Sequence, residues 1–202
     1  MTAANPAPVA RGRRQLLGLA ALYFVPLGAA FYLYYVGGWR PAGSTNHGEL
    51  ISPARPLPAA SLTLIDGRAA PPDLLTGKWT LVYIGPQVCD RTCQSALINM
   101  RQTRLALAQD AVRVQRLFFA PDGCCDSAAL QREHPGLVIV RAGDRDAAAL
   151  LAQFPPGPVG QRAANLYIVD PLGNLMMRHD AAVRSRDLRD DLRKLLKLSR
   201  IG

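Results

Sequence analysis

A run of 21 residues without a charged side chain, from Leu16 to Val36, lies near the start of this 202-residue chain. A membrane core of about 30 Å is crossed by about 20 helical residues, so the run is long enough to span it. Pro26 in its middle is tolerated in a membrane helix. Trp39 and several tyrosines gather at its far end, as at a membrane interface. The sequence therefore predicts a transmembrane helix over residues 15–37.

The arginines beside this run predict its orientation. Arg11, Arg13 and Arg14 precede it, whereas only Arg40 follows closely. By the positive-inside rule, residues 1–14 are a cytoplasmic tail and the rest of the chain lies outside. The composition, rich in arginine and alanine, is typical of a GC-rich bacterial genome. We therefore expect a single-pass protein of the bacterial inner (cytoplasmic) membrane, with its C-terminal domain facing the periplasm.

A cleaved signal peptide is the alternative interpretation of the same run, with the small residues 28–30 as its cleavage site. The apolar core of a signal peptide is usually about 7–15 residues long. This run is longer and continues past the candidate site, which favours a membrane helix.

The remainder of the chain is predicted to be a proline-rich tether over residues 38–60 and one domain over residues 61–202. Within the domain, strand-like and helix-like segments alternate, which indicates an α/β fold with a central mixed sheet and helices on both faces. We expect strands at 62–66, 79–84, 112–120, 137–140, 165–169 and a segment ending at 177, and helices at 92–109, 144–154 and 184–199.

The formal net charge of +9 suggests an anionic partner. Nucleic acid is excluded as that partner, because the domain is predicted to lie outside the cytoplasm. Residues 184–200 carry seven basic side chains against three aspartates. They are interpreted as a solvated helix face or, alternatively, as a surface for anionic lipid or an acidic partner.

Cys89 and Cys93 directly follow the predicted buried strand and begin the next helix. The positive end of a helix stabilises a thiolate, and Arg91 between the cysteines adds positive charge. Cα atoms four residues apart in a helix are separated by about 6 Å, near the upper limit of about 6.8 Å for a disulfide. The pair is predicted to cycle between dithiol and disulfide or to hold a soft metal such as Cu(I). A static disulfide or two buried thiols is the alternative.

Cys124 and Cys125 follow the predicted strand 112–120. If that strand lies parallel to strand 79–84, the loops after both strands emerge at the same edge of the sheet. The second pair would then face the first, as a resolving dithiol or as extra copper ligands. A vicinal disulfide or an idle exposed pair is the alternative.

The first part of the domain resembles the SCO/SenC family of membrane-anchored thioredoxin-like proteins. The resemblance rests on LTLIDGRAAPPDLLTGKWTLVYIGPQVCDRTCQSAL (62–97), VQRLFFAPDG (114–123) and NLYIVDPLGN (165–174). It implies a thioredoxin-like fold and a role in assembling cytochrome c oxidase. In that family, two cysteines and a distal histidine bind copper, Cu(I) or Cu(II), for the copper A centre of subunit II. Thiol–disulfide exchange on the cysteines of that subunit is the other implied activity.

This chain departs from the family pattern in two respects. Asp90 and Gln94 stand where the family usually has proline after each cysteine. The distal histidine is missing, and Arg162 is the expected occupant of its position. A guanidinium cannot ligate copper, but it can stabilise the thiolate of Cys89 or Cys93, which favours redox chemistry.

The sequence thus predicts a thiol–disulfide oxidoreductase that acts on cytochrome c oxidase subunit II or on another assembly factor. Cys89, as the more exposed cysteine, attacks the partner disulfide and Cys93 resolves the mixed disulfide. One alternative is a Cu(I) chaperone whose third ligand comes from Cys124, Cys125, His134 or His179. The other is a structural assembly factor that needs no cysteine and docks through its basic C-terminal helix.

Overall fold

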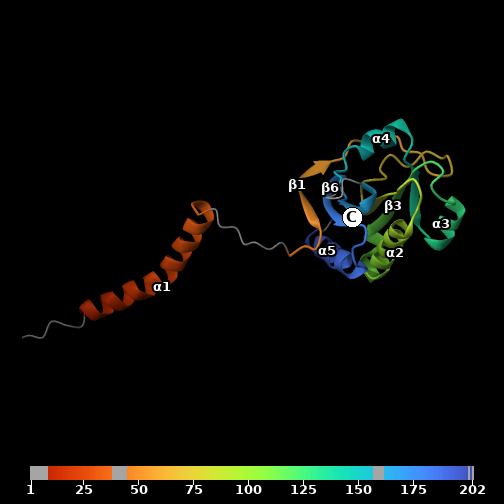
Figure 1. The fold of residues 1–202 in the computed structure, drawn as a ribbon. Coiled ribbons are helices and arrows are strands. Elements are labelled where there is room, and N and C mark those ends of the chain that lie inside the picture. Colours follow the sequence, from red (N-terminus) through yellow and green to blue (C-terminus); the bar gives the residue numbers. More distant parts are fainter. Residues whose placement is uncertain (1–8, 38–44, 157–161, 200, 202) are drawn as a thin grey trace, which may run out of the picture. The chain divides into compact units, whose positions relative to one another are not determined.

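The computed structural model of the chain describes residues 9–37, 45–156, 162–199 and 201, and it divides into two compact units, Met1–Ser44 and Thr45–Gly202 (Figure 1). The first unit contains one helix, α1 (Val9–Tyr35), which starts earlier than predicted. Its segment Gly12–Tyr35 is long and apolar enough to cross a membrane. Large apolar side chains are exposed along this whole segment, which suits lipid rather than water.

The second unit is a six-stranded mixed sheet with helices on both faces (Figure 1), as the sequence predicted. The sheet order is β1-β6-β5-β2-β3-β4. The strands are β1 (Glu49–Pro56), β2 (Trp79–Ile84), β3 (Val114–Ala120), β4 (Leu137–Arg141), β5 (Asn165–Val169) and β6 (Asn174–Asp180). The helices are α2 (Arg91–Leu105), α3 (Ser127–Glu133), α4 (Arg145–Leu151) and α5 (Ser185–Leu198), with short 3-10 turns at Ala108–Arg113 and Arg162–Ala164.

Two apolar cores lie on the two faces of this sheet, because side chains alternate along each strand. Tyr83 of β2 packs into the core under α2 and α5, whereas its neighbour Val82 packs into the core under α4. Leu188 and Leu192 of α5 are fully buried in the first core, with the basic side chains of α5 on its outer side. The C-terminal helix is therefore held by its leucine stripe, as its amphipathic pattern predicted.

β2 pairs with β3 in parallel, in a register that sets Trp79 opposite Val114 and Ile84 opposite Phe119. The condition for the two cysteine loops to meet is therefore fulfilled. Both strands are almost entirely buried. Continuous apolar sequences of this kind are typical of parallel strands that are covered on both faces. The loops after β2 and β3 consequently start side by side.

The prediction that residues 38–60 form a tether is wrong for part of this range. Residues 38–44 lie outside the described residues, but strand β1 occupies 49–56 and pairs antiparallel with β6. Backbone hydrogen bonds to an edge strand need no apolar pattern in the sequence, and β1 is largely exposed. Proline is tolerated on an edge strand, so Pro53 and Pro56 did not prevent pairing.

Two further elements differ from the prediction. The segment 62–66 forms only isolated bridges, because the turn at Gly67 (φ +85°) sends the chain back on itself so that Thr63 pairs with Ala69. Helix α2 ends at Leu105 rather than at residue 109, and a 3-10 turn continues from there.

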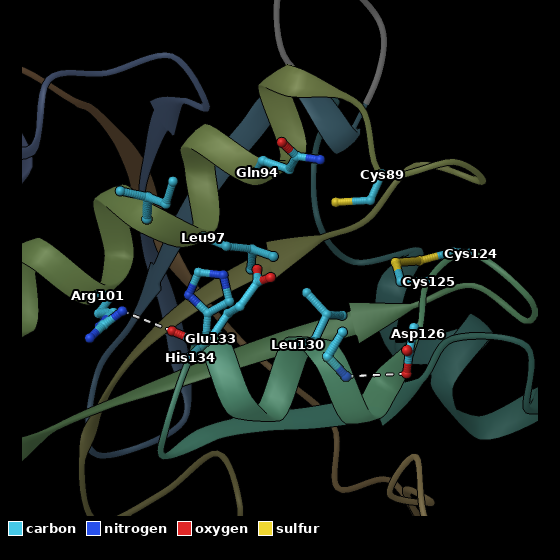
Figure 2. Close-up of a pocket in the computed structure, with 12 residues that line it drawn as sticks. Cys89, Gln94, Leu97, Arg101, Cys124, Cys125, Asp126, Leu130, Glu133 and His134 are labelled. Atoms are coloured by element: carbon cyan, nitrogen blue, oxygen red, sulfur yellow. Dashed lines mark hydrogen bonds between the residues drawn. A yellow bond between two sulfur atoms is a disulfide. The ribbon is translucent and has the colours of Figure 1, made fainter.

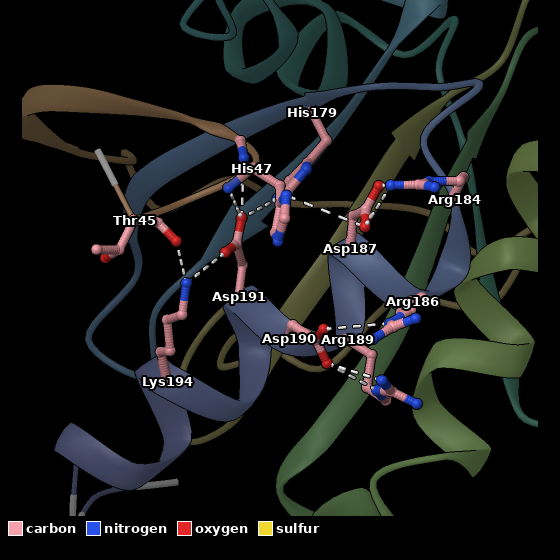
Figure 3. Close-up of polar contacts among 11 residues, drawn as sticks. Thr45, His47, His179, Arg184, Arg186, Asp187, Arg189, Asp190, Asp191 and Lys194 are labelled. Carbon is pink, nitrogen blue, oxygen red and sulfur yellow. Dashed lines mark hydrogen bonds and ion pairs between the residues drawn. The ribbon is translucent and has the colours of Figure 1, made fainter. Parts of the chain in front are cut away.

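A buried carboxylate fastens the start of the second unit to α5 (Figure 3). Asp191 is fully buried and accepts hydrogen bonds from the backbone N–H groups of His47 and Gly48, both at 2.8 Å. Its Oδ2 lies 3.5 Å from Nε2 of His179, and Lys194 contacts its other oxygen at 3.4 Å. Gly48 approaches the His179 ring so closely that a Cβ there would meet Nε2 at 2.5 Å.

We expect Asp191→Ala to lower the free energy of unfolding by about 2–4 kcal/mol, because it leaves two backbone donors without their acceptor. Urea unfolding of the full chain in a neutral detergent measures this. Asp190→Ala is the matched control, since Asp190 pairs only with arginines on the partly exposed face of the same helix, and it should cost less than about 1 kcal/mol. Equal losses in the two variants would contradict the role assigned to Asp191.

A candidate thiol–disulfide site at one edge of the sheet

Cys89 and Cys93 lie where strand β2 gives way to helix α2. Asp90 is the N-cap of α2, and its Oδ1 accepts a hydrogen bond of 2.9 Å from the backbone N–H of Cys93. Aspartate is among the residues that most favour an N-cap. Because Asp90 has an extended backbone, Cys89 stands outside the helix and Cys93 inside its first turn.

The two cysteines form a disulfide with a Cα–Cα distance of 5.2 Å. This is shorter than the helical spacing that the sequence suggested, since only one of the two residues is helical. Cys93 is fully buried, whereas Cys89 is half-buried. The difference in exposure predicted for the pair is therefore present.

Cys124 and Cys125 form a second disulfide, in the loop after β3. This loop and the loop after β2 are joined directly: Gln87 Nε2 donates to the carbonyl of Asp122 at 2.9 Å. Gly85 donates its backbone N–H to Phe119 at 2.9 Å. The parallel pairing of β2 with β3 thus continues into the loops and brings the two cysteine pairs together.

Cys89 of the first pair and both cysteines of the second line one cavity of about 480 Å³, which α2 and α3 also enclose (Figure 2). Cys93 is buried behind it. Figure 2 shows Cys89 and the Cys124–Cys125 disulfide at the same end of the view, with the Cys89 sulfur directed toward the start of α2. The lining residues are Cys89, Gln94, Leu97, Ile98, Arg101, Cys124, Cys125, Asp126, Ala129, Leu130, Glu133 and His134. Apolar side chains make up its middle, and charged ones lie around them.

His134 is the histidine that the structure brings to this cavity. It is 5% exposed, and its Nδ1 is buried without a hydrogen-bond partner among the described residues. Burial lowers the pKa of His134, and the charge of Arg116 lowers it further. The ring is therefore neutral at pH 7, the form that ligates a metal.

The other predicted site residues lie elsewhere. Arg91 is exposed at the first position of α2 and is not among the residues that line the cavity. Arg162 donates its Nε to the carbonyl of Phe154 at 2.8 Å, a contact that involves neither cysteine. His179 packs against Asp191, so it is not a candidate third ligand beside Cys89 (Figure 3).

Two contributors to the site were missed in the sequence. Asp90 was noted only as a departure from proline, although an aspartate directly before a helix is a standard capping signal. Helix α3, one wall of the cavity, was not predicted. Its signal was Asp126, which accepts from the N–H groups of Ala128 and Ala129, followed by strong helix formers.

The cavity offers two kinds of chemistry. All four sulfurs are in disulfides, so the domain in this state can exchange with a partner thiol, whereas attack on a partner disulfide first requires reduction of the domain. Copper binding first requires reduction, because the ligand is the thiolate. After reduction, Cys89 and Cys93 supply two soft ligands and neutral His134 lies in the same cavity. The two thiolates suit Cu(I), but within the described residues no three His, Cys, Asp or Glu side chains are grouped so as to hold a metal ion.

A mixed sheet with a cysteine pair at the strand-to-helix junction defines a thioredoxin-like domain, here preceded by one long apolar helix. Residues 79–199 match the family model described as "Transmembrane-like, thioredoxin-like, C-terminal domain". The chain belongs to this family. Comparison with curated protein sequences returns no significant relative.

Solved structures of Sco proteins share the fold. Apo Sco1 from Thermus thermophilus is 21% identical with a TM-score of 0.60, covering 77% of this chain and 99% of that one. ScoI from Bradyrhizobium japonicum with copper bound is 20% identical with a TM-score of 0.54, covering 69% and 98%. BsSco, described as having a disulfide switch and as belonging to the Sco family of cytochrome c oxidase assembly proteins, is 14% identical with a TM-score of 0.53, covering 73% and 96%. The resemblance to SCO/SenC proteins is thus confirmed in the fold.

Asp90 sets a negative charge between the two cysteines. We expect Asp90→Asn, which keeps a capping oxygen but removes the charge, to raise the alkylation rate of Cys89 at pH 7 by roughly 2- to 5-fold in the reduced protein. Iodoacetamide labelling with peptide mass analysis measures it. Asp144→Asn, at the N-terminus of α4, is the control and should leave the rate unchanged. An unchanged rate in Asp90→Asn would contradict the electrostatic role.

Proposed function

We propose that this protein is a membrane-anchored thiol–disulfide exchange protein that assists cytochrome c oxidase assembly at the copper A centre. The observation that carries the proposal is the pairing of half-buried Cys89 with fully buried Cys93 beside an open cavity. The more exposed sulfur of Cys89 can react with a partner protein, and the buried sulfur of Cys93 can then resolve the mixed disulfide. The apolar helix α1 is proposed to hold the domain on the periplasmic face of the inner membrane, where thiol redox state is actively managed.

The exchange proceeds in two balanced steps. The Cys89 thiolate attacks one sulfur of a partner disulfide, which forms a mixed disulfide and releases a partner thiolate. The Cys93 thiolate then attacks Sγ of Cys89, which forms the Cys89–Cys93 disulfide and releases the second partner thiolate. The partner gains two electrons and the domain loses two. The reverse sequence oxidises a partner dithiol.

Cys124 and Cys125 are proposed to act as a resolving pair for the first disulfide. Their position on the same cavity as Cys89 supports this role. One of their thiolates attacks Sγ of Cys89 and displaces the Cys93 thiolate, and the second then closes the vicinal disulfide and frees Cys89. Two electrons pass from the second pair to the first, so that Cys89 is again ready to reduce a partner.

Arg91 and Arg162 are kept in the proposal as positively charged groups, although neither lines the cavity beside Cys89. Arg91 is exposed beside Asp90 and would favour approach of an anionic partner thiolate. For Arg162 to reach a thiolate, its bond to Phe154 must first break. Cytochrome c oxidase subunit II or another assembly factor is the proposed partner.

The exchange is tested with the reduced full chain in neutral detergent and an oxidised peptide that carries the two cysteines of the copper A loop. We expect the wild type to reduce the peptide, Cys93→Ser to accumulate a mixed disulfide at Cys89, and Cys89→Ala to lose more than about 100-fold in rate. Mass analysis after alkylation quantifies each species. The proposal fails if no disulfide is transferred and Cys89→Ala leaves oxidase assembly intact in cells.

The same assay tests the resolving role of Cys124 and Cys125 separately. In the wild type, the disulfide gained from the peptide should be found on Cys124–Cys125 after the first turnover. In the variant Cys124→Ala/Cys125→Ala it should stay on Cys89–Cys93, with an unchanged initial rate. A disulfide that stays on Cys89–Cys93 in both proteins contradicts the resolving role alone.

A Cu(I) chaperone is the second candidate function, and the placement of His134 favours it. Copper is then the cargo, with the Cys89 and Cys93 thiolates as two ligands. His134 must move toward them to become the third, because no ready group of three such ligands exists among the described residues. Copper-bound ScoI shares this fold, and His134 lies on the same cavity as Cys89 with an unpartnered buried Nδ1.

Anaerobic Cu(I) titration of the fully reduced chain tests this candidate. We expect one equivalent to bind, and His134→Ala to weaken binding by roughly 10- to 100-fold, since a thiolate pair alone gives a weaker site. His47→Ala, a change of an exposed histidine, serves as control. Identical affinities of the wild type and His134→Ala would remove His134 as the third ligand, and a loss on changing Cys124 and Cys125 would assign the ligand to that pair.

A further inference from the structure

A buried arginine in the middle of the domain has no counter-charge among the described residues. Arg116 of β3 is 2% exposed, and its Nη2 donates to the carbonyl of Pro135 at 2.5 Å. Its Nε and Nη1 are buried and have no hydrogen-bond partner among the described residues. Burial, and then the charges of Arg104 and Arg101, lower the pKa of Arg116 to about 10. The group remains charged at pH 7 all the same.

Two arginines of α2 stand beside it. Arg101 and Arg104 line, with Arg116, a cavity of about 140 Å³ that Leu105 and Pro135 complete. Each is held by a backbone carbonyl: Arg101 Nη1 donates to Glu133 at 2.8 Å, and Arg104 Nε donates to Val114 at 2.7 Å.

These carbonyls orient the guanidinium groups but do not neutralise them. Within the described part of the chain, no carboxylate lies within ion-pair distance of Arg101, Arg104 or Arg116. Three like charges around one cavity repel one another, and a buried charge without a partner opposes folding. A bound anion relieves both effects.

We propose that the cavity between α2 and β3 binds a small oxyanion of the phosphate type. Guanidinium groups bind phosphate oxygens through planar, charge-assisted pairs of hydrogen bonds, and three of them converge here. The volume of about 140 Å³ suffices for an ion of five heavy atoms, given that one water takes about 30 Å³ in the liquid. This site uses no residue that reacts in the proposed exchange, although Arg101 also lines the cavity of the cysteines.

The cavity opens beside Leu105, which is 63% exposed, so an ion can enter from solvent. Arg116 forms its floor, while exposed Arg101 and half-buried Arg104 form its rim. A phosphate group has the same chemistry whether it is free or part of a lipid headgroup. The test therefore has one arm for each source.

The experiment is a thermal unfolding series of the full chain in a neutral detergent, at constant ionic strength, with sodium phosphate replacing sodium chloride. We expect the unfolding midpoint to rise by about 4 °C when phosphate reaches roughly ten times its Kd. The double variant Arg101→Gln/Arg104→Gln should lose this rise and still fold, because both changes lie at the rim. Arg132→Gln/Arg145→Gln removes the same charge from exposed positions of α3 and α4 and should keep the rise.

A second variant and a second ligand complete the test. Arg116→Met should also lose the response, and it removes the buried charge itself. Titration with a short-chain phosphatidic acid assigns the site to a headgroup if the lipid acts at lower concentration than phosphate, and to the free ion if only phosphate acts. The proposal is overturned if neither ligand raises the midpoint above its value in chloride, or if the rim double variant responds as the wild type does.

Discussion

The parallel pairing of β2 with β3 is the constraint on which the rest of this structure depends. It places the carboxyl ends of two buried strands at one edge of the sheet, so that the loops that follow them start side by side although they are far apart in sequence. One loop carries Cys89 and the other carries Cys124 and Cys125. The cavity with two disulfides follows from backbone hydrogen bonding within the sheet, before any side chain of the site is considered.

The difference in exposure between Cys89 and Cys93 then gives the two cysteines different roles. Capping by Asp90 fixes the first turn of α2 and buries Cys93 in the core, while Cys89 stays at the cavity. The same carboxylate places a negative charge where thiolate chemistry favours a positive one, and with burial it raises the pKa of Tyr83 in the strand behind the site. Stability of the helix start and reactivity of the cysteines therefore oppose each other at one residue.

Two buried charged groups of this domain, Asp191 and Arg116, differ in their hydrogen-bond partners. Asp191 accepts from two backbone N–H groups and from Lys194, and its Oδ2 lies 3.5 Å from Nε2 of His179. It ties the chain that precedes β1 to the last helix. Arg116 has one backbone partner and two arginines as its charged neighbours. The Asp191 carboxylate has its hydrogen-bond donors within the chain. Two nitrogens of Arg116 have no partner among the described residues, which a bound anion would supply.

The sequence by itself determined the apolar N-terminal helix and the buried strands, because long apolar runs and amphipathic periods report burial directly. The parallel pairing of β2 with β3 came from the tertiary structure. The sequence also predicted the cysteine pair at the strand-to-helix junction. It could not predict β1, whose pairing uses backbone groups that any sequence offers, or α3, whose short helix depends on the cap at Asp126 and on packing against the cavity. Only the tertiary structure decided which histidine lines the cavity of Cys89, His134 rather than His179. It alone also showed that three arginines from two elements line one cavity with no carboxylate in ion-pair distance among the described residues. Both depend on distances between residues remote in the chain, and local sequence patterns carry no information about such distances.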